Sequence, residues 1–373
     1  MMRRLMRLSK SLGVRVLITL AAVALALVRF PAAWIESYYS TGLYPRLTGI
    51  LQPMAELSPV SILDILLVAV AVGLPAWWIF CIRRAAAGAR WAGAGRAAVG
   101  TLTLAALLVC GFELLWGLNY QRQPLSAKLE WDAKRVTPEA AVALARNTIQ
   151  RLNAEASVAR SQAMSRDWRA GLERSFRQVV TELGGPADFH GVAPRNSLVV
   201  PLLAAEGCEG FVNPFGYEVI LDDETLTFEK PFLLAHEWAH LAGFADESEA
   251  NFIGILTCLR SDQAMLRYSG LLNLSFYLPR RSPAAPLPEL APQVVSDIKA
   301  IDERVRKHYQ PMVGNMQSRI YNQFLKVNRV RAGIASYGLV AQLMVGTRFE
   351  TNWTPIMRGT ADAVTTRAIA GDE

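Results

Sequence analysis

The chain has 373 residues, 52% of them hydrophobic, and a formal net charge of +7 at pH 7. Its mean hydropathy of +0.20 is high for a fully soluble protein and indicates that part of the chain lies in a membrane. The basic excess requires no nucleic-acid partner, because much of it flanks the apolar segments and is the charge that orients a membrane protein.

Three N-terminal segments are long and apolar enough to span a bilayer: residues 16–35, 62–82 and 97–116. Lys and Arg gather before the first segment and between the second and third, whereas the loop between the first two carries only Arg46. The positive-inside rule then places the N-terminus in the cytoplasm and everything after Asn119 outside it. The alternative for the first segment is a cleaved signal peptide, but two further spans favour an uncleaved anchor.

The extracytoplasmic part begins with predicted helices. One starts at Thr137, an N-cap followed by a proline at the first helical position, and runs to about residue 155. Another covers residues 167–183 and is ended by Gly184-Gly185-Pro186. Residues 196–203 and 216–221 are then rich in β-forming side chains and are predicted as strands.

The second of these runs shortly precedes the motif that carries the chemistry. An edge strand in such a place can align an extended peptide through main-chain hydrogen bonds. Phe215, Gly216, Tyr217 and Glu218 are therefore expected to line a substrate cleft. The alternative is an ordinary core hairpin.

The most informative motif is His236-Glu237-Trp238-Ala239-His240, an H-E-x-x-H pattern inside an apolar stretch. Residues four apart lie on one face of a helix, and that spacing allows His236 and His240 to bind one Zn²⁺. Glu237 is then placed as the base that takes a proton from zinc-bound water. A satisfied core histidine is the competing interpretation.

A second helix follows Gly243, which is expected to end the first one. Glu247, Ala250, Asn251 and Gly254 share one face of it, and the two small residues let that face approach the histidine helix. Glu247 is therefore predicted as the third zinc ligand, with the fourth position left for water, as in a catalytic site. Asn251 is either a residue that orients a ligand or a helix-packing amide, while Glu249 is expected to face elsewhere.

This pairing of H-E-x-x-H with E-x-x-A-N resembles the gluzincin metallopeptidases, including the membrane-bound prenyl-protein endopeptidases. The chain is more similar still to a family of bacterial membrane proteins of unknown function, suspected to be zinc peptidases, and this resemblance covers most of its length. The segments that carry it are residues 38–45, 115–120, 213–215, 267–270 and 336–338. The resemblance implies His236, His240 and Glu247 as zinc ligands and Glu237 as catalytic base. It also implies a plasma (inner) membrane location.

Beyond the motif, helices are expected at residues 249–261, 262–278, 293–308, 317–327 and 332–344. A peptidase needs a donor for the oxyanion besides the metal, and Tyr268 and Tyr337 are the leading candidates because they lie in the family-like segments. Either could instead be a core tyrosine. Cys208 and Cys258 are a disulfide pair or buried free thiols.

The expected fold is mainly α: three transmembrane helices (residues 1–118), an α+β gluzincin-like, minimal-zincin domain (119–348) and a flexible tail (349–373). The expected function is that of a membrane-anchored metallopeptidase with one Zn²⁺ per chain. It would hydrolyse peptides or envelope proteins at the outer face of the membrane. The alternative is a non-catalytic envelope scaffold or sensor that retains a zincin-like fold.

Overall fold

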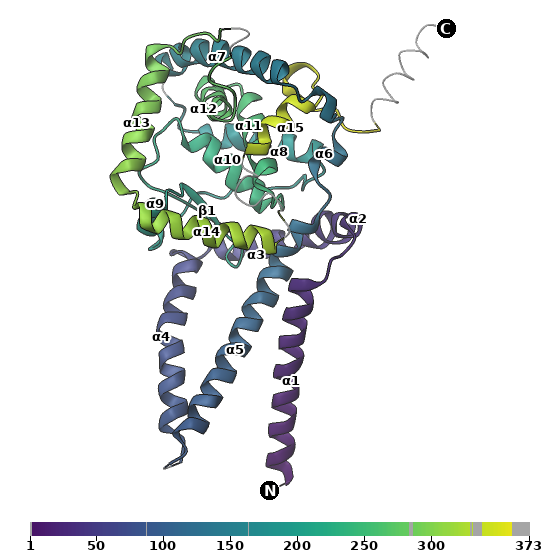
Figure 1. Ribbon diagram of the computed structural model, residues 1–373, viewed down its shortest axis with the longest axis vertical. Helices are drawn as coiled ribbons and strands as arrows, with labels where there is room; N and C mark the ends of the chain where they lie inside the picture. The colour runs from purple at the N-terminus through teal and green to yellow at the C-terminus, as the bar shows by residue number, and fades with distance from the viewer. Residues whose placement is uncertain are drawn as a thin grey trace.

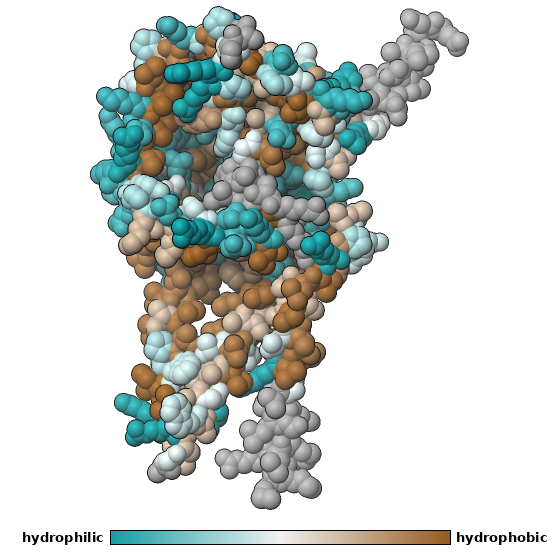
Figure 2. Space-filling model, viewed as in Figure 1, coloured by the Kyte–Doolittle hydropathy of each residue, from teal (hydrophilic) through white to brown (hydrophobic). Residues whose placement is uncertain are grey.

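The computed structural model describes residues 2–86, 88–162, 164–282, 286–328, 330 and 338–359. The protein is mainly helical with one small sheet, as expected. Three long helices extend from one edge of a rounded helical domain, and Figure 2 shows that hydrophobic residues cover much of their surface.

The long helices are α1 (Met2–Leu27), α4 (Ile62–Arg83) and α5 (Arg90–Leu115). By length and composition α4 and α5 can each cross a membrane, and a third crossing is present only if a bent pair, Gly13–Leu27 with Ala32–Glu56, counts as one span. The two halves of that pair meet at 108°. The first apolar helix thus ends earlier than the predicted residue 35, because Pro31 cannot continue a helix.

After the bend the chain follows the edge of the domain instead of the direction of α1 (Figure 1). This stretch consists of α2 (Ala32–Trp34), the π-helix η1 (Ile35–Leu43) and α3 (Tyr44–Glu56).

The domain is built around two buried helices, α10 (Lys230–Leu241) and α11 (Glu247–Leu259). Its other helical segments are η2 (Gly117–Gln121), α6 (Leu125–Lys128), η3 (Ala133–Arg135), α7 (Pro138–Ser161), α8 (Trp168–Glu182), α9 (Val200–Glu206), α12 (Ala264–Phe276), α13 (Pro292–His308), α14 (Pro311–Val327), α15 (Val340–Gly346) and η5 (Thr351–Trp353). The predicted start of α7 is confirmed, since Thr137 Oγ1 accepts from the amide of Ala140 at 3.2 Å. Part of the helix expected at residues 332–344 falls outside the described residues.

The sheet has two antiparallel strands, β1 (Gly210–Asn213) and β2 (Glu218–Leu221). Because β2 also meets Arg195 in a single parallel bridge on its other side, β1 is the free edge in the described part of the chain. The strand predicted at residues 196–203 is wrong, since Val200 begins α9. Pro201 suits the first turn of a helix and lacks the amide hydrogen that a sheet ladder requires.

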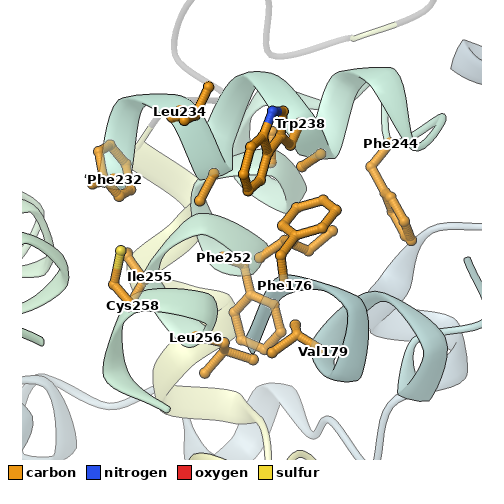
Figure 3. Packing of buried hydrophobic residues seen from close by; sticks show 14 of the residues in the cluster. Phe176, Val179, Phe232, Leu234, Trp238, Phe244, Phe252, Ile255, Leu256 and Cys258 are labelled. Atoms are coloured by element: carbon orange, nitrogen blue, oxygen red, sulfur yellow. The ribbon is translucent and has the colours of Figure 1, made fainter. Parts of the chain in front are cut away.

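The core lies between α8, α10 and α11. Figure 3 shows the ring of Phe176 between Trp238 and Phe252, and the centroids of Phe176 and Trp238 are 5.6 Å apart. All residues of α10 from Pro231 to Leu241 are buried, and only Lys230, at its first position, is partly exposed. Side chains on this helix are therefore held rigidly.

The expected boundaries between anchor, domain and tail do not separate independent cores. Tyr39, Tyr44 and Trp116, from the expected anchor, are buried in the same hydrophobic cluster as α10 and α11. The expected flexible tail differs too: Met357 pairs with Leu129 in an antiparallel bridge. Residues 349–359 are thus part of the domain, and residues 360–373 lie outside the described part.

Candidate metal centre

The histidine helix and the glutamate helix are joined by a tight turn. Gly243 has φ of 87°, in the left-handed region that glycine adopts without strain, and its amide donates to the carbonyl of His240 at 3.0 Å. Asp246 then caps α11 by accepting from the amides of the second and third residues of the helix. Six residues therefore suffice to bring Glu247 back to the histidines.

Close packing of α10 on α11 depends on Gly254. A Cβ at this position would lie 3.2 Å from the ring of Phe232 and 3.3 Å from the amide nitrogen of His236. The prediction that a small residue lets the second helix approach the first is confirmed. Glu249, as expected, faces away and accepts from the amide of Leu125 at 2.6 Å.

Three ligand atoms converge on one point. Nε2 of His236 and Nε2 of His240 each lie 3.4 Å from Oε2 of Glu247, and all three atoms lie within 4.8 Å of one another. In a tetrahedral zinc site with ligand distances of about 2.0–2.1 Å, neighbouring ligand atoms are about 3.3–3.4 Å apart. Both histidine–carboxylate separations fit that geometry. Among the described residues, no other group of His, Cys, Asp or Glu converges in this way.

Hydrogen bonding orients the ligands. Nδ1 of His240 lies 2.8 Å from the carbonyl oxygen of Phe244. Because a carbonyl can only accept, Nδ1 carries a hydrogen, and Nε2 is the ring nitrogen that faces the centre and can give up its proton to a metal ion. Oε2 of Glu247 is buried, and although it faces both imidazole Nε2 atoms at 3.4 Å it accepts no well-formed hydrogen bond in the described chain. A buried acceptor in that state is costly, and a cation at the centre would satisfy it.

The charges of the cluster are strongly coupled. Burial raises the pKa of Glu247, but the two histidines outweigh burial and hold that pKa well below its usual value. Burial lowers the pKa of His240, yet Glu247 outweighs it and raises that pKa to about 9. Without a metal the cluster is thus an ion pair between an imidazolium and a carboxylate, and a divalent cation would replace the proton.

Glu237 lies on the same helix, with its carboxylate against β1. A Cβ on Gly210 would be only 2.5 Å from Oε1 of Glu237, so the side chain lies where a larger strand residue would clash. Burial raises the pKa of Glu237, and the adjacent histidines oppose that shift only in part. A carboxylate with a raised pKa is suited to accept and return a proton near neutral pH.

Two aromatic residues that the sequence did not indicate as site residues border the cluster. The hydroxyl of Tyr321, on α14, donates to Oε1 of Glu247. Nε1 of Trp116, just after α5, donates to the carbonyl of His240 at 2.9 Å, and the two rings meet edge to face with centroids 6.1 Å apart. The apolar helix α5 therefore ends in contact with a ligand residue.

The other residues that the sequence indicated have varied surroundings. Asn251 is buried in α11, and its amide nitrogen has no partner among the described residues. The hydroxyl of Tyr268 donates to Asp297 at 2.5 Å, which joins α12 to α13 and does not face the cluster. Tyr337 lies outside the described residues. Cys208 and Cys258 are free thiols.

The expected cleft strand packs instead against the apolar helices α4 and α5. Glu218 is buried and accepts from the amides of Ile62 and Leu63 at 3.1 and 2.8 Å, so it caps α4. The hydroxyl of Tyr217 donates to the carbonyl of Leu115 at 2.9 Å, at the end of α5.

Phe215 and Gly216, the two residues before Tyr217, also contact α5 and α4. A Cβ at Gly111 of α5 would touch the ring of Phe215 at 3.3 Å, and a Cβ at Gly216 would touch Ile62 of α4 at 3.0 Å. Residues 215–218 therefore join the domain to α4 and α5, and β1, the other strand, is the one beside Glu237.

The fold and the site together define a mainly helical protein with two or three apolar helices long enough to cross a membrane and a buried His-His-Glu cluster. The family model described as a protein of unknown function (DUF3810) matches residues 39–345. The match covers most of the chain, which therefore belongs to that family. No curated protein and no solved structure matches the chain.

Proposed function

We propose that the protein is a membrane-anchored zinc peptidase that hydrolyses peptide bonds at the outer face of the plasma membrane. The observation that carries the proposal is the 3.4 Å separation of both histidine Nε2 atoms from Oε2 of Glu247. Three protein ligands on one cation leave a fourth position open, which is characteristic of catalytic rather than structural zinc.

When bound, zinc would supply a Lewis acid that polarises a carbonyl and lowers the pKa of water. The protein's own residues supply the rest. His236, His240 and Glu247 would hold the cation, and Glu237 would remove a proton from the attacking water and deliver it to the leaving amine. The rigid, buried helix keeps this carboxylate in place through both transfers.

A substrate path is available on the side of β1. This strand is the free edge of the sheet in the described part and begins beside Glu237, so an extended peptide could pair with it through main-chain hydrogen bonds. A hollow of about 320 Å³ also begins one turn before the motif, lined by Leu233 and Tyr277 among others. Burial raises the pKa of Tyr277 to about 12 and Glu247 adds to that shift, so the phenol lies within electrostatic reach of the cluster.

The proposed topology has three crossings, with the bent pair as the first. Basic residues flank the ends of the long helices that lie away from the domain, at the N-terminus and between α4 and α5. The positive-inside rule makes that side cytoplasmic. Because Trp116 contacts His240 directly, the centre then lies close to the outer surface of the bilayer, and segments of envelope proteins near the membrane are the proposed substrates.

The test compares the detergent-purified protein with Glu237→Gln, His240→Ala and Glu224→Gln, the last a surface control. Elemental analysis should find about one zinc per chain in all but His240→Ala. Hydrolysis of a quenched fluorescent peptide library should persist in the native protein and Glu224→Gln. It should fall at least about a hundredfold in Glu237→Gln, since general-base catalysis contributes roughly 10²–10⁴-fold.

If the native protein takes up no metal after zinc is supplied, the proposed peptidase function is refuted. If the native protein binds metal but hydrolyses no peptide, and if Glu237→Gln keeps the protein's cellular role, the results would favour a scaffold or sensor instead.

A further inference from the structure

The exposed hydrophobic side chains of the domain are concentrated on a few elements. On α14, Met312, Met316 and Ile320 are 83, 59 and 62% exposed and follow one another at intervals of four residues. These three residues form the outer stripe of α14. Scattered exposed apolar residues are ordinary, but a continuous row of them marks an interaction surface.

Other elements along this edge of the domain also carry exposed apolar residues. Leu198 and Leu202, before and within α9, are exposed, as are Ile50, Met54 and Leu57 at the end of the α3 segment. Figure 1 shows α14 and α3 lying along the edge of the domain from which α4 and α5 extend, at a steep angle to both helices. The apolar row therefore runs where the hydrophobic surface of the long helices begins.

This placement is fixed by contacts with the membrane helices. The carboxylate of Asp64, in the first turn of α4, accepts from the hydroxyl of Ser197 at 2.6 Å and from the amide of Leu198 at 3.1 Å. On the inner face of α14, the ring of Phe324 meets Phe112 of α5 edge to face, with centroids 5.8 Å apart. The outer stripe consequently points away from the domain at the level of the helix ends.

The composition of α14 favours lipid as its partner. The helix contains no acidic residue, and its two basic residues, Arg319 and Lys326, are exposed beside the stripe. An amphipathic helix with an apolar face bordered by cations is the form that lies in a membrane interface, where the long basic side chains reach the phosphates.

We propose that the outer stripe of α14 is a lipid-contact surface that lies in the leaflet next to the domain, and that the bilayer thereby holds Tyr321 against Glu247. Tyr321 is on the inner face of the same helix, and its hydroxyl donates to a metal-ligand carboxylate. Release of α14 from lipid would withdraw this contact and expose the cluster. The proposed lipid contact depends only on the exposed residues of α14 and their position. Its effect on catalysis rests, in addition, on the proposed function.

The first measurement is depth in the membrane. Met316→Cys and Ser318→Cys, each labelled with an environment-sensitive fluorophore, would be compared in the full chain, reconstituted in vesicles of phosphatidylcholine and phosphatidylglycerol. The two positions point about 200° apart on the helix, and the labelled native chain gives the background from its own thiols. Nitroxide lipids should quench the label at residue 316 several-fold more than the label at residue 318.

Equal quenching at the two positions would overturn the proposal. So would an emission at residue 316 that changes with protein density in the vesicle, because the stripe would then contact a second copy of the chain.

The second measurement concerns the link to the cluster. Met316→Glu with Ile320→Glu should make His236 and His240 react several-fold faster with diethyl pyrocarbonate in vesicles, whereas Asn315→Glu with Ser318→Glu should not. His190 and His308, whose side chains are 81 and 40% exposed, are internal standards, and unchanged rates there exclude general unfolding. Unchanged rates at His236 and His240 would show that lipid does not hold Tyr321 in place. Neither measurement requires peptidase activity.

Discussion

At the scale of single residues, the centre depends on which atoms carry protons. The metal-free cluster is stabilised by a charged His240 next to Glu247, and the raised pKa of this imidazole, about 9, follows from that carboxylate. A group with a raised folded-state pKa stabilises the fold fully below its unfolded pKa, here 6.5. The contribution is lost as the pH rises through 9.

Metal binding is therefore expected to release protons. Between pH 6 and 8 the apparent zinc affinity should rise about tenfold per pH unit, because one proton leaves His240 as the cation binds. Calorimetric titration in two buffers with different ionisation heats measures the number released. A pH-independent affinity would contradict a ligand role for His240, and Glu224→Gln, distant from the cluster, should titrate like the native protein.

At the scale of elements, β1 and α10 depend on one another at Gly210. Gly210→Ala should push Glu237 out of place, since the added Cβ would lie 2.5 Å from the carboxylate. Zinc content should be unchanged while kcat falls at least about tenfold, because a displaced base loses most of its contribution. Gly95→Ala on α5, where a Cβ meets nothing within 4 Å, is the matched control. Full activity in Gly210→Ala would exclude β1 from the reaction.

The sequence predicted the local part of the centre and missed the distant part. His236, Glu237, His240 and Glu247 lie within twelve residues, so helical periodicity and one glycine turn were enough to bring them together. Tyr321 arrives from α14, 74 residues beyond Glu247, and only tertiary packing decides that contact. The sequence predicted no role for Met312, Met316 and Ile320, because spacing places residues on one face of a helix but does not tell whether that face is exposed.

The strands show a different kind of failure. Residues 216–221 were predicted as a strand, and the prediction is confirmed for β2, which covers Glu218–Leu221. Which strand becomes the edge beside α10 depends on Arg195, which meets β2 on its far side. Periodicity assigns faces to a strand but does not assign its neighbours in the sheet.

At the scale of the whole molecule, anchor and domain form one folding unit. Tyr44 donates to the carbonyl of Leu241 at 2.9 Å, Trp116 donates to that of His240 at 2.9 Å, and both rings are buried. Each aromatic ring removed from a core costs about 3–5 kcal/mol, a large share of the roughly 5–15 kcal/mol that stabilises a domain.

An excised fragment of residues 119–348 is therefore expected to be unfolded or molten. Near-ultraviolet circular dichroism and zinc content compare it with the full chain in detergent. A fragment with native-like side-chain signals and bound zinc would show that the membrane helices only tether the domain.

The contact between Trp116 and His240 has a practical consequence. The tilt of a transmembrane helix adjusts to the thickness of the surrounding hydrocarbon, and the residue that follows α5, Trp116, is hydrogen-bonded to His240 of the cluster. Short-chain detergents, long-chain detergents and nanodiscs impose different tilts. If the proposed function holds, the membrane mimetic is thus a chemical variable of the cluster, as pH and ionic strength are, and zinc affinities or activities measured in different mimetics should differ.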